Sequence, residues 1–372
     1  MKFKNRTLVI AAALLTLLIV VIYVVITQSS ATTPESKQPL AQDKGEGSGE
    51  KGNVSKQEEQ GDGASETGKE TEGKDKGVII DINGARYMIF KDRAVTLFHY
   101  SETAADKYAD VLNQFRSAVP ESVNVYSMLV PTSADFVNYE QSGATSDSQK
   151  NALAHIQQKL DKKVNVVDVY GTLAEHQKEY VYFRTDHHWT ALGAYYSYVK
   201  LMENMGMQPV ALSEYEEGKI EQFLGTMYKT TKSETLKQHP DTISYYMPKD
   251  DYSFEIRTTT GKMVKRNLVD PKYAQPEQGF YGVFLGGDAP MGEVTTSNKN
   301  GKSIVVIKDS YGNAFIPFLV PHYEKVFFID PRSFAGSISQ FVKERQITDV
   351  LFLNNSTVAR HSGIADLILE KM

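Results

Sequence analysis

The stretch SIVVIKDSYGNAFIPFLVPHYEKVFFIDPRSFAGSISQFVKERQITDVLFLNN, residues 303–355, decides the fold class. Uniformly apolar strands that alternate with helices are typical of a parallel sheet covered by helices on both faces. The sequence therefore predicts an α/β fold with a parallel sheet. The expected strands are three short, largely apolar runs, and the expected helices lie between them: strands at 303–307, 325–329 and 348–353, and helices at 313–320 and 337–345.

Upstream of this stretch, the pattern predicts further elements of the same domain. Asn83-Gly84 between two strand-like runs is a strong signal for a β-hairpin over residues 78–90. Residues 208–301 are polar and rich in Tyr, Gly and Pro, and we interpret them as a β-rich insertion on the substrate side. Apolar periodicity predicts the remaining elements: strands at 123–130 and 164–169, and helices at 104–118, 146–160 and 191–204.

The N-terminus begins with a short basic segment and an uncharged apolar run, TLVIAAALLTLLIVVIYVVIT, at residues 7–27. About 20 such residues span a bilayer as a helix. We expect a retained signal anchor over residues 1–27, which would make this a single-pass protein of the cell membrane with its C-terminal domain outside. A cleaved signal peptide is the alternative, although its apolar run is usually shorter.

The segment 28–77 has no aromatic residue and very few aliphatic ones. Such a composition buries too little apolar surface to offset the chain entropy lost on folding. We therefore predict a disordered extracellular linker over residues 28–77 and a folded domain over residues 78–372.

Composition excludes several classes of function. The chain has 41 Lys and Arg against 46 Asp and Glu, a net charge of −5, and no Cys. The absence of a basic excess argues against nucleic-acid binding. The absence of Cys excludes disulfides, a cysteine nucleophile and thiolate metal sites. No cofactor is predicted.

Ser310 is the candidate nucleophile. It follows the strand at 303–307 and precedes the helix at 313–320, so it lies at the carboxyl edge of the sheet, where functional groups gather. The start of the next helix offers backbone N–H groups to a developing oxyanion. The alternative is that Asp309 or Ser310 only caps that helix.

A second cluster, RTDHHWT at residues 184–190, contains two adjacent His residues and the single Trp. The spacing of Asp186 and His188 allows the carboxylate to orient the imidazole of the same segment, as the third group of a catalytic triad does. A zinc site formed by Asp186, His187 and His188 is the rival interpretation. We do not predict a metal, because the other His residues are scattered along the chain.

RTDHHWTALGAYYSY and VVIKDSYGNAFIPFL resemble the signature of the DHHW proteins. These are extracellular Gram-positive relatives of the alginate O-acetyltransferases with an SGNH-hydrolase-like fold. FIDPRSF and VLFLNN are also similar to strand ends of that group. The resemblance implies an SGNH-hydrolase-like, flavodoxin-like sheet with circularly permuted catalytic blocks, since the Asp-x-His element precedes the serine.

The resemblance implies a role for each residue of the two motifs. Ser310 would be the nucleophile, His188 the general base and Asp186 the group that orients His188. The backbone N–H of Ser310 would donate to the oxyanion. Asn354 or Asn355, at the end of the last strand, would supply the Asn that SGNH proteins use as a further donor.

Five further residues are candidates for substrate binding. Arg184 and Arg332 would bind a polar or anionic group of a glycan. His187 and Trp189 would shape the substrate face or pack beneath it. Tyr281 belongs to a Tyr-rich set whose rings can stack on sugars. For each of these residues, packing or a surface ion pair is the alternative.

Two other features lie close to the expected cleft. Gly286, Gly287 and Asp288, in GVFLGGDAP, are candidates to line it. Lys308 stands before Asp309, where these proteins usually have a small residue.

Together, the motifs and the resemblance indicate a serine-dependent O-acetyltransferase or acetylesterase that acts on a cell-envelope polysaccharide through an acyl-serine. Because acetyl-CoA is absent outside the cell, a multipass membrane acyltransferase is the expected partner that supplies the acyl group. A non-catalytic glycan-binding or assembly module of the same fold is the alternative, and a zinc-dependent deacetylase is a third.

Overall fold

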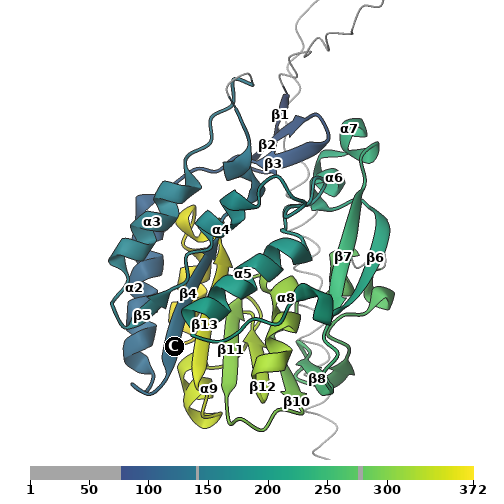
Figure 1. The fold of residues 1–372 in the computed structure, drawn as a ribbon. Coiled ribbons are helices and arrows are strands. Elements are labelled where there is room, and N and C mark those ends of the chain that lie inside the picture. The colour runs from purple at the N-terminus through teal and green to yellow at the C-terminus, as the bar shows by residue number, and fades with distance from the viewer. Residues whose placement is uncertain (1–76, 140–141, 275–279) are drawn as a thin grey trace, which may run out of the picture. The chain divides into compact units, whose positions relative to one another are not determined.

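Three β-sheets form the framework of the domain in the computed structural model, which describes residues 77–139, 142–274 and 280–372 (Figure 1). The predicted anchor at residues 1–27 lies outside these residues, as does almost all of the predicted linker. The strands are β1 (Val78–Ile82), β2 (Ala85–Phe90), β3 (Arg93–Thr96), β4 (Asn124–Val130), β5 (Val164–Val166), β6 (Glu216–Phe223), β7 (Asp241–Met247), β8 (Tyr252–Arg257), β9 (Met263–Arg266), β10 (Met291–Thr296), β11 (Ser303–Lys308), β12 (Lys325–Ile329) and β13 (Asp349–Asn355).

Most of the helices cover the largest sheet, on both of its faces. Within the described residues, none of them is both long and apolar enough to cross a membrane. They are α2 (Glu102–Ala118), α3 (Gln149–Lys159), α4 (Tyr170–Glu175), α5 (Ala191–Asn204), α6 (Thr226–Thr231), α7 (Glu234–Lys237), α8 (Gly312–Phe315), α9 (Ile338–Glu344) and α10 (Gly363–Glu370).

The central sheet has eight strands in the order β5-β4-β13-β11-β12-β10-β8-β9. Strands β5, β4, β13, β11 and β12 are parallel to one another, as predicted. Strands β10, β8 and β9 continue the sheet in antiparallel register. All three come from residues 208–301, so the sheet is mixed rather than parallel throughout. The remaining strands of that segment, β6 and β7, pair with each other in a separate sheet.

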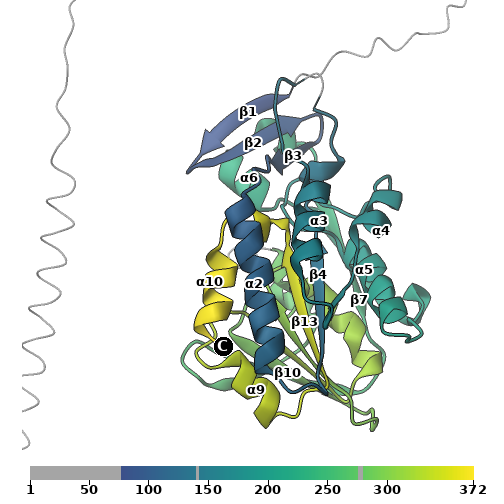
Figure 2. The same cartoon turned by 90° about the vertical axis from the view of Figure 1, so that its left-hand side faces the viewer.

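Alternating side chains of the buried strands divide the apolar core into two layers. In β11, Val305 and Ile307 pack with α2, α3, α9 and α10, while Ile304 and Val306 pack on the opposite face with α5 and α8. Figure 2 shows α2 and α10 on one side of the sheet and α5 on the other. Burial on both faces explains why these strands are largely apolar.

The helix predicted at residues 313–320 is shorter than expected. The α-helix α8 ends at Phe315 and continues as a 3-10 helix over Ile316–His322. Pro317 and Pro321 lack the backbone N–H that an α-helix would need at these positions. The helix predicted at 191–204 is confirmed with the same bounds, and the side chain of Thr190 caps it by accepting from the backbone N–H of Gly193.

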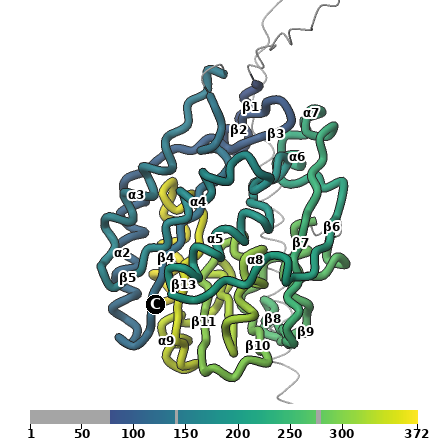
Figure 3. Tube along the Cα trace, in the orientation of Figure 1, coloured from purple at the N-terminus to yellow at the C-terminus, as the bar shows by residue number. Residues whose placement is uncertain are grey.

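The predicted hairpin is also present, as β1 and β2. Asn83 and Gly84 both have positive φ, 50° and 77°, as a two-residue hairpin turn requires. Strand β3 completes a three-stranded sheet that lies beside α6 and α7 in the chain trace (Figure 3). The backbone N–H of Ala94 in β3 donates to the carbonyl of Arg184 at 3.0 Å, so this small sheet supports the RTDHHWT segment.

Candidate active site

Ser310 lies on the turn between β11 and α8, at the carboxyl edge of the central sheet. The turn is fixed by the buried carboxylate of Asp309, which accepts from the backbone N–H of Tyr311 at 2.9 Å. The same carboxylate accepts from the backbone N–H and the side-chain Nδ2 of Asn355 at 2.8 and 3.0 Å. Burial raises the pKa of Asp309. Neither Asp309 nor Ser310 caps α8, because its N-cap residue is Tyr311.

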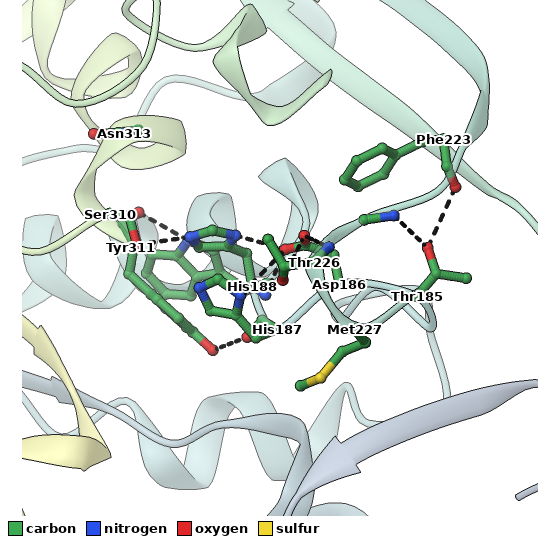
Figure 4. A network of polar contacts seen from close by, with 12 residues as sticks. Thr185, Asp186, His187, His188, Phe223, Thr226, Met227, Ser310, Tyr311 and Asn313 are labelled. Carbon is green, nitrogen blue, oxygen red and sulfur yellow. Dashed lines mark hydrogen bonds and ion pairs between the residues drawn. The ribbon is translucent and has the colours of Figure 1, made fainter. Parts of the chain in front are cut away.

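Ser310, His188 and Asp186 form a continuous series of hydrogen bonds (Figure 4). The Nε2 atom of His188 is 2.7 Å from the Ser310 hydroxyl, and its Nδ1 atom is 2.6 Å from Asp186 Oδ1. A carboxylate only accepts, so Nδ1 carries the proton and Nε2 accepts from the serine hydroxyl. The imidazole is therefore in the tautomer that a general base beside a serine requires.

Asp186 is only 2% exposed, and all of its hydrogen bonds come from nearby protein donors. Its Oδ1 accepts a second bond from the backbone N–H of His188, and Oδ2 accepts from the backbone N–H and hydroxyl of Thr226 at 2.7 and 3.0 Å. Burial by itself would raise the pKa of Asp186. The charge and hydrogen bond of His188, with the donor from Thr226, instead hold that pKa well below its usual range. Asp186 is thus an ionised partner for His188.

Gly225 allows Asp186 and Thr226 to approach each other. A Cβ atom at position 225 would lie 2.3 Å from the Asp186 Cβ and 2.4 Å from Asp186 Oδ2. No side chain fits there unless Asp186 moves. The backbone N–H of Gly225 also donates to the hydroxyl of Thr185 at 3.0 Å, which ties the two segments together.

The buried carboxylate of Asp241, at the start of β7, anchors the beginning of the RTDHHWT segment. It accepts from the backbone N–H and hydroxyl of Thr185 at 2.7 and 2.6 Å, and from the backbone N–H of Arg184 at 3.0 Å. The hydroxyl of Tyr180 donates to it as well. This segment has little regular secondary structure, so these side-chain bonds hold it in place.

Trp189 and Tyr311 join the RTDHHWT segment to the serine turn. The Trp189 indole is completely buried, and its Nε1 donates to the carbonyl of Tyr311 at 3.0 Å. In return, the Tyr311 hydroxyl donates to the carbonyl of His187 at 2.5 Å. Trp189 therefore packs beneath the site, which is one of the two roles predicted for it.

The hydrogen-bonded series opens into a cavity of about 180 Å³, which we call the serine pocket. The ring of Tyr281 stacks on the His188 imidazole with 3.9 Å between centroids and 5° between planes. Tyr281 thus lies in the pocket, where a substrate-contacting role was predicted for it. The lining residues are Asp186, His188, Phe223, Gly225, Thr226, Lys229, Tyr281, Gly282, Gly287, Asp288, Ser310 and Asn313.

A charged network centred on Asp288 forms one wall of the serine pocket. Its carboxylate accepts from Asn313 Nδ2 at 2.9 Å and from Arg332 at 2.7 Å, and it lies 3.4 Å from the ammonium of Lys308. Lys308 is completely buried, and its ammonium also lies 4.0 Å from the carboxylate of Asp330. Burial would raise the pKa of Asp288, but the cationic groups of Lys308 and Arg332 lower it to about 2.

Several residues predicted for the site lie elsewhere. The Asn354 side chain is completely buried and accepts from the hydroxyl of Tyr108 on α2, while Asn355 donates to Asp309. Neither lines the serine pocket, so the oxyanion role predicted for Asn354 or Asn355 has no geometric support. The Asn that does line it is Asn313, on α8.

The two predicted arginines are also engaged in ion pairs. Arg184 pairs with Asp241 at 3.3 Å and with Asp92 at 3.5 Å, and it lines a different cavity. Arg332 pairs with Asp330 and Asp288 and does not line the serine pocket. Arg332 therefore contacts the wall of the pocket through the carboxylate of Asp288.

The His187 ring lies beside that of His188, with 3.8 Å between centroids and 36° between planes, but it lines a different cavity. Asp186, His187 and His188 each offer a ligand atom within 4.8 Å of the others, the arrangement considered above as a zinc site. His188 uses both ring nitrogens in hydrogen bonds to Asp186 and Ser310, and His187 Nδ1 bonds to the hydroxyl of Thr226 at 2.6 Å. The observed contacts match the triad interpretation more closely than the zinc interpretation.

The residues that position Asp186 were not predicted from the sequence. Thr226 is 40 residues from Asp186, and Asp241 is 56 residues from Thr185. Gly225, Thr226 and Asp241 all lie in the segment assigned to an insertion. No local spacing pattern relates a residue to a partner at such a distance along the chain.

Comparison with known proteins gives two kinds of match. The sequence matches the DHHW protein family over residues 58–329. The crystal structure of a DHHW family protein from Eubacterium siraeum is similar at 35% identity and a TM-score of 0.72, covering 80% of this chain and 98% of that chain. Among curated protein sequences, none matches.

Two solved structures are similar at lower identity. Bacillus cereus PatB1, solved with a sulfonyl adduct, shares 17% identity at a TM-score of 0.64, over 78% of this chain and 98% of that chain. This match shows a similar fold. The O-acetyltransferase domain of Pseudomonas putida AlgJ shares 12% identity at a TM-score of 0.44, over 76% of this chain and 96% of that chain.

Proposed function

From its membership of the DHHW protein family and the geometry of its serine pocket, we propose that this chain is an enzyme that forms an acyl-serine at Ser310. One observation carries the proposal: Ser310, His188 and Asp186 are hydrogen-bonded in series, and all three side chains line one cavity. A serine hydroxyl is a weak nucleophile until an adjacent base takes its proton, and this series supplies such a base.

The proposed reaction has two halves. The Oγ of Ser310 attacks the acyl carbonyl of the donor and passes its proton to Nε2 of His188, while the carboxylate of Asp186 stabilises the imidazolium. His188 then protonates the leaving oxygen of the donor, and the acyl group stays on Ser310. In the second half, His188 removes a proton from the acceptor hydroxyl, which attacks the acyl-serine. The imidazolium then returns this proton to Oγ as Ser310 leaves, and both residues regain their starting states.

The tetrahedral intermediates need hydrogen-bond donors that are already in place. We assign this role to the backbone N–H of Ser310 and to the carboxamide of Asn313, which lines the same pocket. Asp288 accepts from Nδ2 of Asn313 and fixes the orientation of its amide. Asn313 thus takes the role that the sequence analysis assigned to Asn354 or Asn355.

We propose acetyl transfer to a cell-envelope polysaccharide as the activity, with hydrolysis when water is the acceptor. The resemblance of the two motifs to relatives of the alginate O-acetyltransferases supports the acyl group and the class of acceptor. The apolar run at residues 7–27 supports a membrane anchor with the domain outside the cell. A multipass membrane acyltransferase would then supply the acetyl group.

The direct test is turnover of p-nitrophenyl acetate by the full-length chain in detergent. Ser310→Ala and His188→Ala should each lower kcat by roughly 10³-fold or more, because the members of such a triad act as a unit. Ser117→Ala removes an exposed helix serine whose hydroxyl donates to the carbonyl of Asn113, and it should leave kcat unchanged. Turnover that survives Ser310→Ala would refute the proposal.

Transfer and hydrolysis are separated by adding acceptors. A transferase should move acetyl from p-nitrophenyl acetate to an added polysaccharide, with less free acetate released as the acceptor concentration rises. Unchanged acetate release, with no acetylated glycan, would assign the chain to the esterases. Glycan binding without turnover in the wild-type chain would instead favour the non-catalytic module.

A further inference from the structure

A second cavity, of about 130 Å³, lies back to back with the serine pocket, and we call it the Arg360 pocket. Three pairs of consecutive residues form the wall between the two cavities. His188, Thr226 and Ser310 line the serine pocket. Their neighbours in the sequence, His187, Met227 and Tyr311, line the Arg360 pocket.

The Arg360 pocket lies at the carboxyl ends of parallel strands. Thr132 and Ser133 follow β4, Ser356 and Thr357 follow β13, and Tyr311 follows β11. Crevices at these strand ends are the usual ligand-binding positions in α/β sheets. The catalytic chemistry proposed above uses none of the side chains that line this cavity.

The charge in this pocket is uncompensated. Among the described residues that line it, Arg360 is the only one with a permanently charged side chain. Arg360 is half-buried, and no ion pair or side-chain hydrogen bond of its guanidinium occurs within the part of the chain that the structure describes. Most other arginines of the domain, such as Arg184 and Arg332, are paired with carboxylates. A guanidinium left unpaired in a cavity favours an anionic ligand.

The other lining groups match a sugar. The hydroxyls of Ser133 and Thr357 form no hydrogen bond with other described residues and can bond to a ligand. Leu97 and Phe98 also line this pocket, and both side chains are buried and apolar. Apolar side chains beside a few placed polar groups are typical of small-molecule sites.

We propose that the Arg360 pocket binds a carboxylate-bearing sugar unit of the acceptor glycan. A single unpaired guanidinium matches a single negative charge, and its planar fork can bind both oxygens of a carboxylate. The neighbouring hydroxyls bind the hydroxyls of the same sugar. Because the two cavities share one wall, a glycan that crosses it would present the hydroxyl of an adjacent unit to Ser310.

This inference rests on the proposed function for the identity of the glycan as acceptor, but the binding test does not depend on turnover. Binding is measured calorimetrically on the full-length chain in detergent, with a tetrasaccharide of glucuronic acid as the probe. The neutral probe is the same tetrasaccharide with its carboxyl groups reduced, and free glucuronate is the third probe. Turnover of p-nitrophenyl acetate by the same sample reports separately on the proposed function.

Arg360→Gln should weaken binding of the acidic tetrasaccharide about tenfold or more, as expected for the loss of a charge-assisted hydrogen bond. Arg360→Lys should be intermediate, because it keeps the charge but loses the fork. The matched control is Arg257→Gln, which removes an exposed arginine of β8 that lines neither pocket and should leave binding unchanged.

Three results would overturn the proposal: equal affinity in Arg360→Gln and Arg257→Gln, equal affinity for the acidic and neutral tetrasaccharides, or no binding of the acidic tetrasaccharide at all. Tighter binding of free glucuronate than of the tetrasaccharide would also overturn the assignment to a glycan. If the wild-type chain lacks turnover but shows the expected loss in Arg360→Gln, then the proposed function fails while the binding site stands.

Discussion

The two segments that meet in the serine pocket are held in place in different ways. The turn that carries Ser310 is the end of β11, a strand with every residue buried in the sheet. The segment that carries Asp186 and His188 belongs to no long strand or helix. It is fixed by side-chain bonds to Asp241 and Thr226 and by the space left at Gly225. Regular structure places Ser310, and tertiary polar contacts place Asp186 and His188.

This difference implies different sensitivities to mutation. The turn that carries Ser310 is held by the whole sheet. The loss of a single contact near this turn should therefore have a smaller effect on the position of Ser310. The RTDHHWT segment depends on a few buried polar groups, and a buried polar group that loses its partner is costly. Substitutions of those distant partners should therefore affect the base more than the nucleophile, and four predictions test this comparison.

The largest effect is expected for Asp241→Asn. The carboxylate accepts from two backbone N–H groups and two hydroxyls, and an amide nitrogen in place of one oxygen would face donors. We expect the free energy of unfolding, measured by urea denaturation, to fall by about 3 kcal/mol. An unfolding free energy within about 0.5 kcal/mol of the wild type would show that Asp241 does not hold the segment.

Gly225→Ala should act on turnover more than on folding. The new Cβ would overlap Asp186, so Asp186 must move and His188 would lose its orientation. We expect kcat for p-nitrophenyl acetate to fall by about 10²-fold while the circular dichroism spectrum is retained. The control is Gly171→Ala in α4, where no atom lies within 4 Å of the added Cβ. Wild-type kcat in Gly225→Ala would contradict the assigned role of Asp186.

Trp189→Phe tests the link between the two segments. It removes the Nε1–H donor to the Tyr311 carbonyl and leaves a small void in the core. We expect a loss of about 1–2 kcal/mol in the free energy of unfolding, from the unpaired carbonyl and the void together. We also measure kcat for p-nitrophenyl acetate. If kcat falls by more than this loss of stability explains, then the link also aligns Ser310 with His188.

The smallest effect is the pH dependence of stability that comes from Asp288. Its pKa is lowered in the folded chain to about 2, so the unfolded chain binds more protons between about pH 2 and pH 4. The stabilisation is therefore present above about pH 4 and is lost as the pH falls towards 2. The Asp288 side chain is 41% exposed, so solvent screening limits the effect to about 1 kcal/mol.

In Asp288→Asn this part of the pH dependence should disappear. The difference in unfolding free energy between the wild type and the variant should shrink as the pH is lowered from 4 to 2. A difference that stays constant over this range would show that Asp288 is not held ionised by Lys308 and Arg332.

The sequence predicted the parts of the fold that have local causes. Strands β11, β12 and β13 have apolar centres because both faces of the sheet are covered, and Asn83-Gly84 specifies its hairpin by positive φ. The family was also predicted and is confirmed, because its two motifs are contiguous in the sequence. The circular permutation of the catalytic blocks stays a prediction, as does the SGNH-hydrolase-like assignment of the fold.

What the sequence did not predict depends on contacts between distant segments. Nothing local indicates that β10, β8 and β9 extend the central sheet, or that Asn354 turns towards Tyr108. For Arg184 the sequence left glycan binding and an ion pair open, and the folded chain pairs it with Asp241. Burial and pairing of charged groups are properties of the tertiary structure, and a motif by itself does not contain them.

The central claim is that Ser310 becomes acylated. The most direct measurement is mass spectrometry of the full-length chain after rapid acid quenching of its reaction with p-nitrophenyl acetate, followed by peptide mapping. We predict the added mass of one acetyl group, located on the peptide that contains Ser310 and absent in Ser310→Ala. Turnover without an adduct on that peptide, or the same adduct in Ser310→Ala, would contradict the account.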